Sequence, residues 1–108
     1  MGMPPYGWTD EDLRDAAFLA KSLSDGNRLK ILLSLREGRR SVSAIVEAVG
    51  LSQPLVSHHL KELKRSLVVK VEREGPFIFY EISDSRVLDV VVALGKVASR
   101  LLSERKGF

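Results

Sequence analysis

Two adjacent histidines, His58 and His59, follow Ser57 in the segment LSQPLVSHHLKEL, residues 51–63. Imidazole side chains can bind a metal, move protons in catalysis, or contact another molecule from one face of a helix. Neighbouring residues on a helix point about 100° apart, so His58 and His59 cannot chelate one ion from a single chain. The sequence also has no recognisable Ser/His/acid trio and no Gly-rich phosphate loop. We therefore predict no metal site, no cofactor and no enzymatic activity.

The segment from residue 52 onward reads as a helix with two different faces. Apolar side chains recur at steps of four, three and four, which predicts a buried face formed by Val56, Leu60, Leu63 and Leu67. The opposite face carries Pro54, His58, Lys61 and Arg65, with Ser57 and Lys64 on one flank and Gln53 at the exposed start. We expect His59 to pack within the fold. For the outward His58, contact with nucleic acid and simple solvation both remain open.

The preceding residues predict three more helices from their end signals. Thr9 with Asp12 forms a capping-box pattern that begins a helix over about 10–23, and Asp25 caps a second helix that ends at Gly38. Ser43 caps a third helix through Val49. Gly50 ends that helix and Ser52 caps the next, so the turn VGLS joins two helices with the spacing of a helix-turn-helix.

The period of the sequence changes after this helix pair. VVKVERE and FIFYEI alternate as strands, with Gly75-Pro76 as the turn between them, and such a hairpin after a helix-turn-helix is a wing. A last helix opens at Asp84 or Ser85 and runs to about Ser103. The predicted fold is a mostly α winged helix-turn-helix of about five helices plus a two- to three-stranded sheet. We expect one domain over 1–108, with 1–7 and 104–108 as loose ends.

Composition limits the class of protein. The chain of 108 residues is 44% hydrophobic and 29% charged, carries a net charge of +3 and contains no cysteine. These values are ordinary for a globular domain and exclude a disulfide framework. No apolar run approaches the roughly 20 residues of a membrane span, and the start has no signal-peptide pattern. We expect a cytoplasmic protein without membrane contact. The mildly basic middle of the chain suits a polyanionic partner, and equally an ordinary solvated surface.

The last helix is apolar on more than one face, which exceeds what so small a domain can cover with its own core. We therefore predict a homodimer in which the first and last helices meet the partner. The residues expected at this interface are Leu13, Ala16, Val91 and Leu94.

The segments LSDGNRLKILLSLREG and SVSAIVEAVGLSQPLVSHHLKELKRSLVVKVEREGPFIFYEI resemble the ArsR/SmtB family of winged-helix regulators, over roughly residues 23–82. The resemblance implies homodimers that bind operator DNA and usually release it when a metal binds. Leu67 stands where the family usually has a glycine at the helix end, and Pro76 where a base often follows the wing glycine. We expect Leu67 to alter the end of the helix and Pro76 to weaken the binding of the wing to DNA.

The metal ligands implied by the resemblance are largely missing. Ser41 and Ser43 occupy the positions of the family cysteines, and a hydroxyl is a poor substitute for a thiolate. Asp84 matches the first of four ligands on the last helix, whereas the other three positions hold Arg86, Val97 and Arg100. We predict that both family metal sites are absent.

In a helix-turn-helix the second helix enters the major groove with its N-terminal residues toward the bases. We therefore predict base contacts from Gln53, Ser57 and His58, and phosphate contacts from Lys61, Lys64 and Arg65, with Lys70 and Arg73 acting from the wing. The predicted function is a dimeric transcriptional regulator, acting as a repressor on an inverted-repeat duplex operator. A winged-helix module for protein–protein contact is the alternative. The sequence leaves any inducer open.

Overall fold

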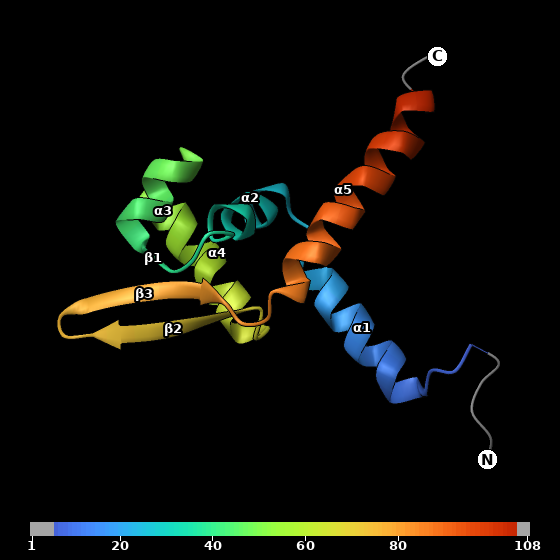
Figure 1. Cartoon of the computed structure of the whole chain (residues 1–108), viewed down its shortest axis with the longest axis horizontal. Helices are drawn as coiled ribbons and strands as arrows, with labels where there is room; N and C mark the ends of the chain where they lie inside the picture. The colour runs from blue at the N-terminus through green and yellow to red at the C-terminus, as the bar shows by residue number, and fades with distance from the viewer. Residues whose placement is uncertain (1–5, 106–108) are drawn as a thin grey trace.

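The computed structural model describes residues 6–105 as five helices and a three-stranded antiparallel sheet (Figure 1). In chain order the elements are α1 (Asp10–Ser22), α2 (Gly26–Ser34), β1 (Arg40–Ser41), α3 (Val42–Val49), α4 (Gln53–Arg65), β2 (Val69–Glu74), β3 (Phe77–Ile82) and α5 (Arg86–Arg105). The strand order is β1-β3-β2, so β2 forms an open edge of the sheet. This arrangement confirms the predicted helices with a β-hairpin.

The helix starts follow local capping chemistry. Thr9 and Asp12 bond reciprocally at 2.9 and 3.1 Å, which is the predicted capping box of α1. Asp25 accepts two backbone N–H groups at the start of α2, as predicted. The predicted N-cap of α3 was wrong, whereas its predicted end at Val49 is confirmed. Its N-cap is Ser41 rather than Ser43, because the Ser41 hydroxyl accepts the N–H of the third helical residue while Ser41 itself is still extended.

Helix α2 is shorter than predicted and ends at Ser34 instead of continuing to Gly38. The N–H groups of Leu35 and Arg36 bond three residues back, to the carbonyl oxygens of Leu32 and Leu33, which tightens the chain into turns. Leu35 is 3% exposed in this conformation. These shorter bonds mark the end of α2, and the helical period of the apolar residues does not reveal them.

The hydrophobic core is built mainly by α2, α3 and α4. Its fully buried side chains are Ile31, Leu32, Ile45, Val56, Leu60, Leu63 and Val68. The hairpin β2–β3 packs against this core near its base, through Val69, Ile82 and Tyr80. Farther along, the hairpin projects away from the helices (Figure 1). The core thus fixes α4 and the base of the hairpin and leaves the tip extended.

Leu67 lies beyond the end of α4 and is 78% exposed, so its predicted place on the buried face was wrong. It adopts the left-handed conformation, with φ of 65°. The N–H of Val68 bonds the carbonyl of Leu63, and the N–H of Leu67 bonds that of Lys64, each at 3.0 Å. This is a Schellman motif, the usual end of a helix before glycine. The expectation that leucine would change the helix end was also wrong.

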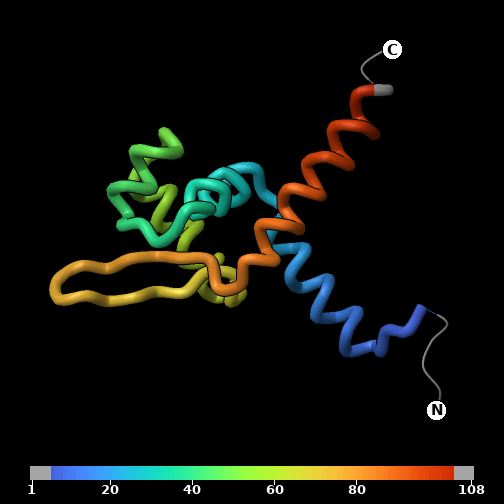
Figure 2. The backbone as a smooth tube through the Cα atoms, in the orientation of Figure 1, coloured from blue at the N-terminus to red at the C-terminus, as the bar shows by residue number. Residues whose placement is uncertain are grey.

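Helices α1 and α5 diverge from each other on the side of the molecule away from the wing tip, α5 toward the upper right and α1 toward the lower right (Figure 2). The radius of gyration of 16.4 Å exceeds the roughly 13 Å of a compact chain of about 100 residues. Helix α1 contributes no buried side chain within the described part of the chain. Helix α5 continues to Arg105, later than predicted, and the remaining predicted loose ends, 1–5 and 106–108, lie outside the described residues.

Candidate nucleic-acid interface

The turn between α3 and α4 is set by Gly50 and Ser52. Gly50 closes α3 in the left-handed conformation, with φ of 69°, and its N–H donates to the carbonyl of Val46 at 2.9 Å. Two residues later Ser52 caps α4 by accepting the N–H of Leu55. The short connection fixes α4 against α3 and directs its N-terminal residues away from the core.

The outer face of α4 carries polar side chains along its length. The exposed residues are Gln53, Pro54, His58, Lys61, Lys64 and Arg65, and Ser57 is half-buried. The amide of Gln53 donates to the Ser57 hydroxyl at 2.9 Å, one helical turn away. This bond holds two of the predicted base contacts in one orientation at the start of the helix.

The two histidines diverge as expected. His59 is buried, with its Nε2 3.9 Å from Oδ1 of Asp25 and its Nδ1 without a hydrogen-bond partner among the described residues. His58 is exposed, and its ring lies 5.5 Å from that of His59 at an interplanar angle of 60°. Within the part of the chain that the structure describes, no group of three metal-binding side chains comes together.

A cleft of about 540 Å³ separates the C-terminal end of α4 from the edge strand β2. Its lining combines three cations with three aliphatic side chains: Lys64, Leu67, Val69, Lys70, Val71 and Arg73. We call it the cationic cleft. Lys64, Lys70 and Arg73 were all predicted to contact phosphate, and the fold brings them together although they come from two elements. Lys70 also pairs with Glu81 at 3.4 Å.

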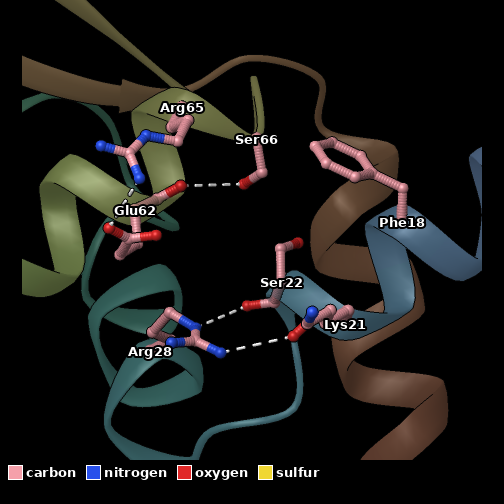
Figure 3. Close-up of a pocket in the computed structure, with 7 residues that line it drawn as sticks. All are labelled: Phe18, Lys21, Ser22, Arg28, Glu62, Arg65 and Ser66. Atoms are coloured by element: carbon pink, nitrogen blue, oxygen red, sulfur yellow. Dashed lines mark hydrogen bonds and ion pairs between the residues drawn. The ribbon is translucent and has the colours of Figure 1, made fainter.

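Arg65 does not join this group. Its guanidinium pairs with Glu62 at 3.4 Å and lines a separate pocket of about 340 Å³ between α1, α2 and α4 (Figure 3). Across that pocket, Arg28 donates to the carbonyl oxygens of Ser22 at 2.7 Å and Lys21 at 3.3 Å. Arg28 therefore ties the C-terminal end of α1 to α2. Sequence analysis missed this role because the partners are backbone carbonyls.

The wing, residues 69–82, carries three carboxylates, and each pairs with a cation. Glu81 pairs with Lys70, and both Glu72 and Glu74 pair with Arg39, which precedes β1. The bond from Arg39 to Glu74 raises the pKa of the guanidinium above its ordinary value. Sequence analysis did not single out Arg39, because it lies 35 residues before Glu74 and only the sheet register brings the two together.

The residues at the family metal positions have other partners. Ser41 Oγ accepts the N–H of Ala44 at 3.2 Å and lies 3.2 Å from Ser43 Oγ. Arg86 forms a two-pronged ion pair with Asp84, with its Nη2 2.7 Å from Oδ2. This pairing lowers the pKa of Asp84 to about 2. An arginine thus holds the carboxylate that a metal would need.

The predicted interface with a second copy is partly exposed in the protomer. Leu13, Ala16 and Leu94 are exposed. Val91 is not, since it is 5% exposed and belongs to the core of its own protomer. The prediction that the core leaves Val91 uncovered was wrong, because α5 reaches α2 near its own start. The other large apolar side chains that α5 exposes are Val90, Val92, Leu94, Val97, Leu101 and Leu102.

Two helices joined at Gly50 and followed by an antiparallel hairpin define a winged helix-turn-helix protein. The chain belongs to the ArsR family. Its residues 25–71 match the family described as bacterial regulatory protein, arsR family. This finding confirms the resemblance drawn from the sequence. Among the described residues, no helix is both long and apolar enough to cross a bilayer.

Relatives support the same membership over most of the chain. The HTH-type transcriptional repressor SmtB of Mycobacterium tuberculosis is 41% identical over 92 residues, which cover 82% of this chain and 68% of that protein. The uncharacterized HTH-type transcriptional regulator MJ1325 of Methanocaldococcus jannaschii is 39% identical, covering 75% of this chain and 92% of that protein. A homodimeric winged helix-turn-helix DNA-binding domain, Mb0332 of Mycobacterium bovis, superposes with a TM-score of 0.74 at 33% identity. That match covers 90% of this chain and 94% of the domain.

Proposed function

We propose that this protein is a transcriptional repressor that binds a specific duplex DNA sequence through α4. The observation that carries the proposal is the polar outer face of α4, which begins at the Gln53–Ser57 bond and leads to the cationic cleft. Glutamine can address adenine through two hydrogen bonds, whereas the lysines and arginine bind phosphates of any sequence. A relative that is 41% identical carries the name of a transcriptional repressor.

We propose that the repressor is a homodimer held by α1 and α5. The support is the exposed apolar side chains that α5 carries beyond Val91, together with Leu13 and Phe18 of α1. The similar M. bovis domain is described as homodimeric. A two-fold dimer presents two copies of α4, so the operator is an imperfect inverted repeat with half-sites about one DNA turn, or a multiple of it, apart.

Zinc, cadmium and arsenite do not act through the family metal positions in this proposal. The support is the ion pair of Asp84 with Arg86 and the capping role of Ser41. The protein has no enzymatic role, and a DNA ligand implies a cytoplasmic protein. An inducer, if one exists, acts elsewhere in the fold.

The test begins with selection of bound duplexes from a random pool by the purified protein. We expect an inverted repeat to be enriched and to bind at least about a thousandfold more tightly than random DNA at physiological salt. Adding each metal at micromolar concentration to the complex should leave the anisotropy of labelled DNA unchanged. No enrichment, together with weak binding to every sequence, would favour the protein-interaction module instead.

A further inference from the structure

The tip of the wing is apolar, and its aromatic ring is held in place. Gly75, with φ of 60°, makes the turn, and Pro76 and Phe77 follow it. Phe77 is 63% exposed, yet its ring centroid lies 6.4 Å from that of Phe79, within the range of aromatic packing. The ring is thus exposed beside the turn of the hairpin. The hairpin itself projects from the body of the molecule (Figure 1).

Arg39 supports this tip from the neighbouring strand. Its guanidinium stacks 4.3 Å above the Phe79 ring while it pairs with Glu72 at 3.3 Å and with Glu74. Phe77, Phe79, Glu72 and Glu74 share one face of the hairpin, because Phe77 pairs with Glu74 and Phe79 with Glu72. Arg39 therefore pairs with both acids beside the tip, offsets one of their two negative charges and packs on the ring against which Phe77 lies.

The reach of the wing beyond Lys70 suits the grooves of DNA. Lys70 is one of the cations that line the cleft, and the four residues from Lys70 to Glu74 extend about 13 Å at the rise of a β-strand. The minor groove is only about 6 Å wide and adjoins the major groove across one phosphate backbone. If Lys64 and Lys70 bind the phosphate backbone of DNA beside the half-site whose bases α4 contacts, the tip of the wing reaches the adjacent minor groove.

We propose that Pro76 and Phe77 form an apolar wedge that enters this minor groove and partly unstacks a base step, and that Arg39 permits the approach by pairing with Glu72 and Glu74 and offsetting part of their negative charge. The inference rests on the proposed function. Apolar wedges of Phe and Pro are known to unstack base steps and to bend the duplex. The wedge would replace the cationic contact that the wing loses by having Pro76 after its glycine.

Duplex DNA suits the tip better than a second copy of the chain does. The tip belongs to the same hairpin as the cationic cleft, so the charge that attracts a polyanion lies beside it. The exposed apolar side chains of α5 lie on a different part of the molecule, and α5 points away from the wing (Figure 1).

The experiment uses the selected operator with 2-aminopurine, a fluorescent adenine analogue, placed in turn at each step flanking the half-sites. We expect the wild-type protein to raise the fluorescence at one flanking step in each half, because unstacking relieves quenching. Phe77→Ala should abolish that rise and weaken operator binding about tenfold while leaving the salt dependence unchanged. Ile78→Ala is the matched control, because Ile78 is exposed on the other face of the same strand, and its affinity should stay within about twofold.

Arg39 is tested by charge rescue. Arg39→Ala should weaken operator binding about tenfold, and adding Glu72→Gln and Glu74→Gln to it should restore most of the loss. Failure of this rescue would show that Arg39 supports only the fold of the wing.

If wild-type protein binds the operator without any fluorescence rise, or Phe77→Ala binds as tightly as wild type, the wedge is wrong while the proposed function stands. A change of sedimentation on Phe77→Ala would instead assign the ring to self-association and overturn the wedge. Wild-type protein that does not discriminate among sequences would overturn the proposed function itself.

Discussion

The backbone N–H of Val68 donates to the carbonyl oxygen of Leu63 at 3.0 Å, and both side chains are buried in the core. This bond and this burial require the residue between the end of α4 and Val68 to turn left-handed, and that residue is Leu67. A side chain costs about 1–2 kcal/mol in this conformation. The turn that leads from α4 into the wing is therefore strained, and its neighbours hold it in place.

Leu67→Gly should raise the free energy of unfolding by about 0.5–1 kcal/mol, since relief of strain exceeds the roughly 0.5–1 kcal/mol of extra chain entropy that glycine loses. Urea unfolding followed by circular dichroism measures the change. Leu67→Ala is the matched control and should give no gain, because alanine keeps the strained Cβ. Equal stability of all three proteins would show that the left-handed turn carries no strain.

Arg28→Ala should lower the free energy of unfolding by about 1–3 kcal/mol, because it removes the charged donors that bond the carbonyl oxygens of Ser22 and Lys21 (Figure 3). Arg28→Lys keeps the charge without the forked geometry, and its free energy of unfolding should lie between those of the wild type and Arg28→Ala. Hydrogen exchange should show the loss first in the last turn of α1. Unchanged exchange there would mean that other contacts hold this junction.

Substitution of the two adjacent histidines should affect different properties, the stability of the fold at His59 and the binding of DNA at His58. His59→Ala removes a buried ring and should cost about 2 kcal/mol of folding free energy. His58→Ala changes an exposed side chain and should alter stability by less than about 0.5 kcal/mol while weakening binding to the selected operator. Thermal unfolding and DNA anisotropy on both variants check this. The reverse pattern would contradict the outward assignment of His58.

Arg86→Ala should return the pKa of Asp84 from about 2 toward its ordinary 3.8, since the side-chain bonds from Arg86 are the main cause of the shift. The lowered pKa means that this ion pair stabilises the fold fully above about pH 4 and is lost as the pH falls through about 2. NMR of the carboxyl carbon of Asp84, recorded between about pH 1.5 and about pH 6, measures the titration. Arg100→Ala is the control and should leave the titration of Asp84 in place.

Replacing Gln53 by Ala should lower discrimination between operator and random DNA by about 1–3 kcal/mol, because a base contact contributes only on the correct sequence. Replacing Lys64 by Ala should weaken binding to both kinds of DNA and reduce the salt slope by about one. Salt titrations on both duplexes distinguish the two. Equal loss on both duplexes for Gln53→Ala would show that Gln53 reads no base.

The parts of the fold that follow from neighbouring residues were predictable from sequence. The capping box of Thr9 and Asp12, the turn at Gly50 and the buried face of α4 through Leu63 are all determined within a few residues. One error was local, since Ser41 rather than Ser43 caps α3. Other errors lie where tertiary packing decides, because burial of Val68 forces the left-handed conformation before it and the packing of α5 against α2 covers Val91.

The candidate site shows the same division. The outward set on α4 was predicted because the helical period places it, and Arg65 alone among its cations turned out to line a different pocket. The role of Arg39 could not be predicted, since it depends on the pairing of β1 with β3 and of β3 with β2. Only the register of the sheet places Glu72, Glu74 and Phe79 under one guanidinium.

Helix α1 has no buried side chain of its own among the described residues, and it is tied to the protomer near its C-terminal end, by the half-buried Leu19 and by the bonds from Arg28. A solitary helix of this length is marginal in water. In the proposed homodimer the partner would cover α1, so in a cell with few copies of the protein α1 would spend part of its time unfolded and open to proteases. The degradation rate of each molecule would then fall as the concentration of the protein rises. A twofold increase in the rate of synthesis would therefore raise the amount of the protein by more than twofold.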